Sequence, residues 1–303
     1  MTPRFTRRWG WGALKFILVV LGIAVLLRQL NQHRTVPLSA LWNFNLLAGW
    51  WLSVLAFGAF AARFRLSLRI AGLILTYRDS LRINALGAFL DFVVPLTGGG
   101  DAAKYLRIRA TNHERAPLLP AAGIALDHFI GFVVALFLTA GLVWRLPIAS
   151  AVMAKLPWLI ALSVLVVIVA LILNRIYRAR TALWIARIYT HRRSTEWALM
   201  WSVLMQTLLA AAVYLAAKGS AITVDYLSIL WVLAASALSA IIPVKIGGLG
   251  ARDVIGTGLF ILLGIPTADA VLLATILYGY RATIAVAGGL VELVRPTVLK
   301  RDS

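Results

Sequence analysis

Long apolar runs constrain this 303-residue chain more than any other feature of its sequence. A helix rises about 1.5 Å per residue, so crossing the hydrocarbon core of a bilayer takes about 20 consecutive apolar residues. Several runs reach that length, and 61% of all residues are hydrophobic, whereas a soluble domain is about half apolar. The sequence therefore predicts an all-α polytopic membrane protein. Hydropathy places about six full transmembrane helices, at 12–30, 44–62, 118–144, 156–174, 197–217 and 268–293.

The predicted domain organisation is a single integral membrane domain over residues 1–303. No Ser/Pro/Gly-rich linker and no long polar stretch separates a second, soluble domain. The N-terminal segment resembles a signal peptide, with basic residues before an apolar run. No small-x-small cleavage site follows it, so we interpret it as an uncleaved first span. Cysteine is absent, which excludes disulfides, thiolate catalysis and cysteine-ligated metals.

Basic residues cluster between the apolar runs, and the formal net charge is +19. In a soluble protein this charge would indicate nucleic-acid binding. Here it fits the positive-inside bias and attraction to anionic lipid, so no nucleic-acid partner is expected. The bias predicts cytoplasmic N- and C-termini. It also places the arginines that follow the second span on the cytoplasmic side, namely Arg63, Arg65, Arg69, Arg78 and Arg82.

Two stretches interrupt the apolar pattern with proline, glycine and charge. They read VVPLTGGGDAAK over 93–104 and IIPVKIGGLGARD over 241–253, and each lies between two apolar arms. Every basic cluster falls on the cytoplasmic side only under one condition. Region 81–115 must start and end inside, and region 227–264 must start and end outside. We therefore predict two oppositely oriented re-entrant broken-helix hairpins, with an inverted repeat as a hypothesis. In the alternative interpretation, Pro95 and Pro243 kink ordinary spans and the glycines serve helix packing.

Ionisable residues in the spans and breaks are the candidate functional groups, because charge at membrane depth is costly. The glycines of each break would present backbone N–H groups at the start of the second arm, where an anion is favoured. Nearby cations would complete a pocket for a phosphate. The predicted substrate-binding residues are Gly98, Gly99, Gly100, Asp101, Lys104, Asp127, Lys245, Gly247, Gly248, Gly250, Arg252, Asp253 and Arg281.

Mutual pairing for structure is the alternative for these charges. Asp127 with Arg281, or Asp101 with Arg252, would offset the cost of burial without any ligand. A surplus of cations would remain after such pairing, which favours a phosphate-bearing ligand. Asp101 and Lys104 are three residues apart and would share a helix face, whereas Asp127 and His128 would point apart.

Enzymatic signatures do not accompany these residues. The segment GGGDAA over 98–103 matches a dinucleotide-binding pattern but lacks the βαβ context that this pattern needs. No P-loop is present. The histidines have no metal-ligand spacing, so neither a metal nor a cofactor is expected. A membrane enzyme with Asp127 or Asp101 as base would lack a nucleophile or metal, so we expect no catalytic residues and no enzyme.

The break residues carry a resemblance to a known family. Pro95 with Gly98–Asp101 forms a Pro then GG-acid element. Pro243 with Gly247, Gly248, Gly250, Arg252 and Asp253 forms a longer P-x-x-x-GG-x-G-x-R-acid element. The chain resembles the lysylphosphatidylglycerol synthase transmembrane-domain family, also described as flippase-like integral membrane proteins, over roughly residues 12–294. It departs from the family's usual arginines with Lys104 and His128, and Lys lacks the bidentate fork of Arg.

This resemblance implies translocation of an anionic, phosphate-bearing lipid across the inner membrane of a bacterial or archaeal cell. The lipid would be a phospholipid or a polyprenyl-linked glycolipid of the cell envelope. Some relatives fuse the domain to a soluble aminoacyl-transferase, and the chain as given resembles a stand-alone member without it, so lysine transfer is not expected. The alternative is a non-transporting membrane partner of a lipid-modifying glycosyl- or aminoacyl-transferase. An oligomer is compatible with either interpretation.

Overall fold

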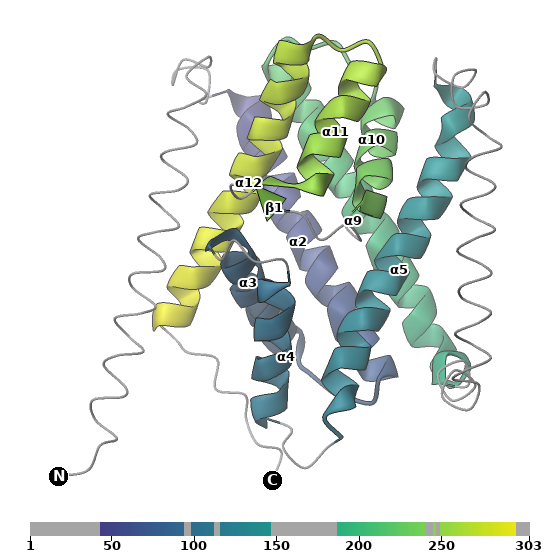
Figure 1. The fold of residues 1–303 in the computed structure, drawn as a ribbon, viewed down its shortest axis with the longest axis vertical. Coiled ribbons are helices and arrows are strands. Elements are labelled where there is room, and N and C mark those ends of the chain that lie inside the picture. The colour runs from purple at the N-terminus through teal and green to yellow at the C-terminus, as the bar shows by residue number, and fades with distance from the viewer. Residues whose placement is uncertain are drawn as a thin grey trace.

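A computed structural model describes residues 43–93, 98–111, 116–146, 187–239, 245–246 and 249–294. Within these ranges the chain is helical apart from one pair of short strands (Figure 1). The elements are α2 (Phe44–Ile70), α3 (Tyr77–Val93), α4 (Gly99–Thr111), α5 (Leu118–Leu142), η2 (Val143–Arg145), α9 (Arg192–Gly219), α10 (Tyr226–Leu238), β1 (Lys245–Ile246), β2 (Leu249–Gly250), α11 (Ala251–Leu262) and α12 (Thr267–Val294).

Four of the predicted spans are confirmed as helices that are long and apolar enough to cross a membrane. They are α2, α5, α9 and α12, and their most apolar windows have mean hydropathies of 1.6 to 2.0. This fold is that of a multi-pass helical membrane protein. α2 extends well past the predicted end at residue 62, because the helix continues through a basic and polar segment to Ile70. The predicted spans 12–30 and 156–174 lie outside the described residues.

Both predicted breaks separate two helical arms. α3 and α4 form the first broken pair, and α10 and α11 form the second. The first pair occupies the lower half of the view and the second the upper half, with their breaks near mid-height (Figure 1). This arrangement fits the predicted opposite orientation of the two pairs.

The two breaks differ in their backbone. Gly98 has φ +83°, a conformation that favours glycine, and α4 begins directly after it. The second break contains β1 and β2, which pair antiparallel with Lys245 opposite Gly250. Residues 94–97 and 247–248 lie outside the described residues, so the structure of each break is known only in part.

Small residues bring the helices close together. In lipid, helix association depends on van der Waals packing and interhelical hydrogen bonds, because the hydrophobic effect gives no preference for helix over lipid. Gly288 of α12 lies against α3, where an added Cβ would be 2.6 Å from the Ala85 carbonyl oxygen. Gly49 of α2 lies equally close to α9, 2.7 Å from the Ala212 oxygen. Gly49 and Gly288 therefore let neighbouring helices approach closely within the spans.

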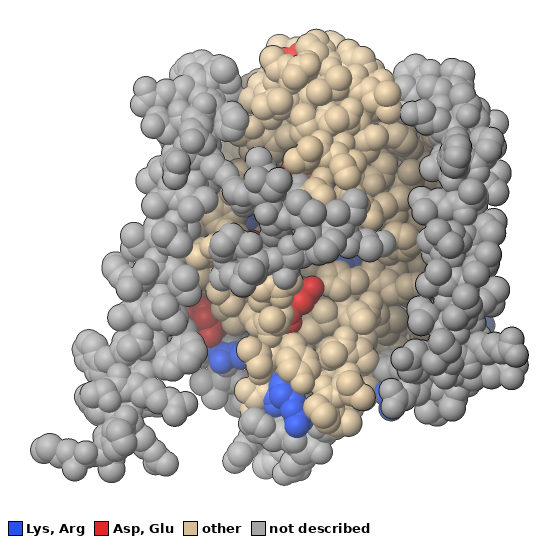
Figure 2. Space-filling view, in the orientation of Figure 1, with Lys and Arg blue, Asp and Glu red and all other residues tan. Residues whose placement is uncertain are grey.

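Each broken pair packs into its own apolar cluster. Phe64, Leu68, Ile83 and Ile108 are buried where α2, α3 and α4 meet. The second cluster joins α9, α10, α11 and α12 around a set of buried side chains that includes Val213, Ile229, Val232, Phe260 and Leu273. On the visible face, Lys and Arg side chains gather mainly in the lower half, on the side of the first pair (Figure 2).

Candidate functional site

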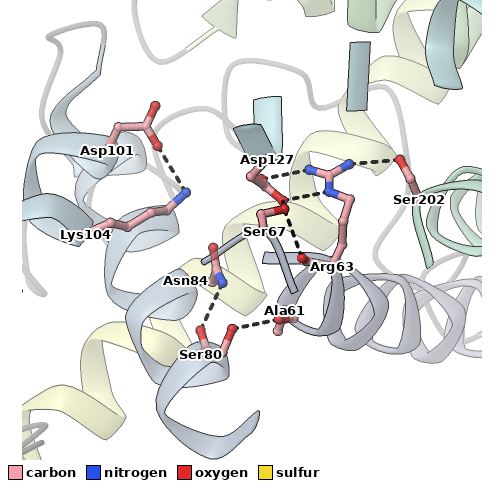
Figure 3. A network of polar contacts seen from close by, with 9 residues as sticks. All are labelled: Ala61, Arg63, Ser67, Ser80, Asn84, Asp101, Lys104, Asp127 and Ser202. Atoms are coloured by element: carbon pink, nitrogen blue, oxygen red, sulfur yellow. Dashed lines mark hydrogen bonds and ion pairs between the residues drawn. The ribbon is translucent and has the colours of Figure 1, made fainter. Parts of the chain in front are cut away.

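A buried ion pair joins α2, α5 and α9 at the centre of the molecule (Figure 3). The guanidinium of Arg63 donates to both carboxylate oxygens of Asp127, at 2.8 and 2.9 Å. Its remaining nitrogen, Nη1, donates to Ser202 Oγ at 3.0 Å. The side chains of Arg63 and Asp127 are only 6% and 2% exposed. Gly131 of α5 leaves room for the guanidinium, since a Cβ there would lie 2.8 Å from Nη1.

This pair corrects two predictions. Arg63 was predicted to follow the end of the second span at residue 62, but it lies within α2 and is buried. Asp127 was paired with Arg281 in the structural alternative, but its partner is Arg63. The physical reason is the length of α2, which carries Arg63 to the level of Asp127 instead of ending before it. The signal that could have found Arg63 is its continuous helical context, FGAFAARFRLSLRI, which contains no proline, asparagine or aspartate.

At the first break, one carboxylate contacts two basic groups. Asp101 Oδ1 accepts from Lys104 Nζ at 3.1 Å, and its Oδ2 lies 2.8 Å from His128 Nε2. The predicted shared face of Asp101 and Lys104 is therefore confirmed. The prediction that Asp127 and His128 point apart is also confirmed, because one faces α2 and the other α4. The suggested pair of Asp101 with Arg252 is wrong, because α4 and α5 supply nearer basic groups.

Lys104 is buried although it is charged. Its side chain is 6% exposed, and its Nζ lies 5.2 Å from the Phe60 ring centroid and 5.4 Å from that of Phe64. Such cation–π contacts stabilise a partly desolvated ammonium group. Arg63 lies over the same Phe60 ring, at 5.1 Å. Phe60 therefore stands between the cation of the first break and the central ion pair.

The start of α4 already holds a carboxylate of the chain itself. The Gly100 N–H donates to Asp91 Oδ1 of α3 at 2.9 Å. A carboxylate at a helix N-terminus satisfies a free amide and interacts favourably with the helix dipole. The Gly100 amide, predicted to bind a substrate anion, is thus occupied by Asp91. Asp91 is not among the predicted site residues, and its spacing of nine residues from Gly100 gives no local signal of the contact.

At the second break, three charged side chains meet between α11 and α12. Arg281 pairs with Asp253 through Nη2 and Oδ1. Arg252 makes no hydrogen bond or ion pair within the part of the chain that the structure describes, although it is partly buried. Two cations and one carboxylate therefore lie together at this place.

A small cavity of about 20 Å³ lies between α10, α11 and α12 at these residues. Arg252, Asp253 and Arg281 line it together with Ser236 and Thr257. The Nε of Arg281 is buried, and it has no hydrogen-bond partner among the described residues. Among the described residues, the two guanidinium groups therefore bring donors without a hydrogen-bond partner to this cavity, beside the Asp253 carboxylate, and such donors can bind an anion.

The remaining predicted residues are placed only in part. Gly98 and Gly99 stand at the start of α4, and Gly250 ends β2 before α11. Lys245 lies in β1, and its side chain is outside the description. Gly247 and Gly248 lie outside the described residues. Within the described ranges, no cluster of three His, Asp or Glu side chains could hold a metal ion.

Comparison with known proteins identifies the same family that the break motifs resemble. The family model of the lysylphosphatidylglycerol synthase TM region matches residues 12–289, which is most of the 303-residue chain. The chain therefore belongs to this family. No curated protein and no solved structure matches the chain.

Proposed function

We propose that this member of the lysylphosphatidylglycerol synthase TM family moves an anionic, phosphate-bearing lipid between the leaflets of the inner membrane. Its apolar helices and its family establish a membrane protein with a lipid-related function. The observation that carries the more specific proposal is Arg252, a cation inside the helical body that has no ion-pair partner within the described residues.

An unpaired cation at membrane depth is costly, so its retention calls for a ligand. Arg252 stands in the first turn of α11, where the helix dipole favours negative charge. A guanidinium can bind a phosphate through two parallel hydrogen bonds. Arg281 would supply a further donor through Nε, while Asp253 holds its Nη2 in place. A lipid phosphate fits this arrangement because it is anionic and offers several acceptor oxygens.

The two broken pairs would form the route by which the lipid head group crosses the membrane. In this proposal they re-enter the membrane from opposite faces, with the first pair on the cytoplasmic side as the positive-inside bias predicts. Irregular backbone at the midplane is tolerated where protein or a watery cavity surrounds it. The cations Arg252 and Arg281 would be exposed alternately to either face of the membrane. The lipid head group would cross with them while the hydrocarbon tails stay in the bilayer. The substrate class is a phospholipid or a polyprenyl-linked glycolipid.

Leaflet exchange in proteoliposomes tests the proposal. Fluorescent phosphatidylglycerol, polyprenyl phosphate and a neutral diacylglycerol would be compared, with a membrane-impermeant quencher reporting the outer leaflet. We expect Arg252→Ala to lower exchange of the phosphate lipids by about 10- to 100-fold, the equivalent of one hydrogen bond to a charged group. Arg252→Lys should fall between, because it keeps the charge and loses the fork.

Arg192→Ala is the matched control, since Arg192 is 75% exposed and pairs with Glu196. It should exchange lipid like wild type. Equal exchange by folded Arg252→Ala would contradict the proposed site. No exchange by folded wild type with either phosphate lipid would favour the alternative, a non-transporting partner of a lipid-modifying enzyme.

A further inference from the structure

One carboxylate beside the first break has two basic partners of different chemistry. His128 Nε2 of α5 lies 2.8 Å from Asp101 Oδ2, and Lys104 Nζ lies 3.1 Å from Asp101 Oδ1. We call Asp101, Lys104 and His128 the first-break cluster. An unperturbed lysine stays charged at neutral pH, whereas an unperturbed imidazole gains or loses its proton between about pH 5 and 8. The charge of the cluster therefore depends on His128.

The geometry indicates which nitrogen of His128 takes up a proton. An ionised carboxylate only accepts hydrogen bonds, so in the neutral imidazole the hydrogen lies on Nε2, the nitrogen that contacts Asp101. Nδ1 then gains the proton, and the bond from Nε2 to the carboxylate is kept. The His128 side chain is 60% exposed, and a groove of about 510 Å³ between α4 and α5 borders both partners. The imidazole is therefore accessible from outside the helical body.

The surrounding helices add little charge to the cluster. Asp127 precedes His128 in α5, but Arg63 of α2 donates to both oxygens of that carboxylate. α4 contributes the other two members of the cluster and Tyr105, which lines the same groove. α9 and α10 also pack on α5, and among the described residues they supply no charge that acts on His128. The charge at the first break is therefore set within the cluster.

Protonation changes what the cluster offers to an anion. With a neutral imidazole, the charges of Asp101 and Lys104 cancel and the cluster has no net charge. With an imidazolium, the net charge is +1, and two cations share one carboxylate, so the Lys104 ammonium is less completely neutralised. At the second break, two guanidinium groups and one carboxylate keep a net charge of +1, because arginine stays protonated. One break thus has a fixed positive charge, and the other has a positive charge that depends on pH.

A phosphate that passes both breaks would be attracted to the first only when His128 is protonated. We infer that translocation of the phosphate-bearing lipid is coupled to protons, with His128 as the proton-binding residue. Uptake of a proton at Nδ1 makes the cluster cationic and attracts the phosphate, and loss of the proton on the opposite side releases it. The proton and the anion cross together, so their charges cancel. This inference rests on the proposed function and names its coupling ion.

Lipid exchange at different pH tests the coupling. The probe is fluorescent phosphatidylglycerol, whose phosphodiester stays ionised throughout the range, in proteoliposomes with equal pH on both sides. We expect wild-type exchange to be about tenfold faster at about pH 6 than at about pH 9, because the imidazole loses its proton between these values. His128→Gln keeps a donor for Asp101 but gains no proton, so it should be slow at both pH values. His128→Arg has a fixed charge and should be fast at both.

Two further measurements complete this test. His191→Gln is the matched control, since His191 precedes α9 and lies outside the cluster, and it should keep the wild-type pH dependence. With an acidic exterior and an alkaline interior, wild type should accumulate the labelled lipid in the inner leaflet. His128→Arg and His128→Gln should leave it evenly distributed, because neither variant carries a proton with the lipid.

Proton uptake on binding separates this inference from the proposed transport. Calorimetry of the full chain in detergent, in two buffers of different ionisation enthalpy, reports the protons taken up with each phosphatidylglycerol. We expect about 0.5–1 proton per lipid at about pH 8 for wild type and none for His128→Gln, since linked binding is reciprocal. Exchange that is independent of pH, without proton uptake, would overturn the inference and leave the transport standing. Proton uptake by a wild type that exchanges no lipid would support the proton site and reject the transport, and neither binding nor exchange would reject both.

Discussion

The two broken pairs share a helix–break–helix arrangement but differ in how their charges are satisfied. At the first break, Asp91 accepts the Gly100 N–H, and Asp101 contacts Lys104 and His128. At the second break, Asp253 pairs with Arg281, while Arg252 has no hydrogen bond or ion pair in the described ranges. The first break is closed around carboxylates of the chain, whereas Arg252 at the second break has no such partner among the described residues.

This difference shows that two similar glycine clusters need not do the same work. A glycine at a helix start offers an amide, but a neighbouring carboxylate can occupy that amide before any ligand arrives. Gly100 is in this situation because α3 brings Asp91 within 2.9 Å. The comparison can be tested by asking which charges destabilise the protein when their partners are removed.

Loss of the central pair should have the largest effect. Arg63→Ala would leave Asp127 buried and without its main partner, and breaking a buried pair costs about 3–5 kcal/mol of unfolding free energy. The measurement is denaturant unfolding of the purified protein in detergent micelles. The double variant Arg63→Met with Asp127→Leu should recover much of the loss, because no unpaired charge remains.

Arg192→Ala is again the control for this prediction, as it breaks an exposed pair with Glu196. Its unfolding free energy should hardly change, since exposed ion pairs contribute little. If Arg63→Ala proved as mild as Arg192→Ala, the central pair would not be the structural link between α2 and α5 that we describe.

A matched pair of substitutions should affect the unfolding free energy differently at the two breaks. Lys104→Gln removes a hydrogen bond between charged groups from the closed first break, and we expect a loss of about 1.5–3 kcal/mol in unfolding free energy. Arg252→Gln in the open second break should cost little, because no partner within the described residues is left behind. Both variants can be followed by the same unfolding titration in detergent. Equal losses would mean that the second break is as closed as the first.

The tight crossing of α3 and α4 should give a smaller effect. A Cβ at Gly100 would overlap the carboxylate of Asp91 and the carbonyl oxygen of Gly87. Gly100→Ala should therefore lower stability by about 1–2 kcal/mol through overpacking. Gly279→Ala in α12 is the control, since nothing lies within 4 Å of its added Cβ. Thermal unfolding in detergent would compare them, and a neutral Gly100→Ala would show that the pair can separate at this point.

Much of the fold follows from hydropathy alone. The expected span 268–293 corresponds closely to α12, and 118–144 to α5, because long apolar runs have few alternatives in a bilayer. The positions of the breaks can also be predicted from the sequence, since proline and glycine interrupt helices. Arg63 was not predictable in this way, because an arginine near a span end is usually assigned to the interface. Its burial depends on Asp127 and Ser202, which come from helices distant in the sequence.

The site was predicted as a set of residue types but not as a set of partners. Asp253 and Arg281 lie 28 residues apart and meet because α11 and α12 pack together. The partner of Asp101 was visible locally at Lys104, whereas His128 required the packing of α5 on α4. Pairing between helices depends on their rotation and depth, which hydropathy does not determine.

The close packing of α12 has a mechanical consequence. Gly288 and Gly289 lie against Ala85 and Phe89 of α3, while Arg281, less than two turns earlier, is tied to α11. One helix thus contacts both broken pairs, so a tilt of either pair would be transmitted through α12 to the other.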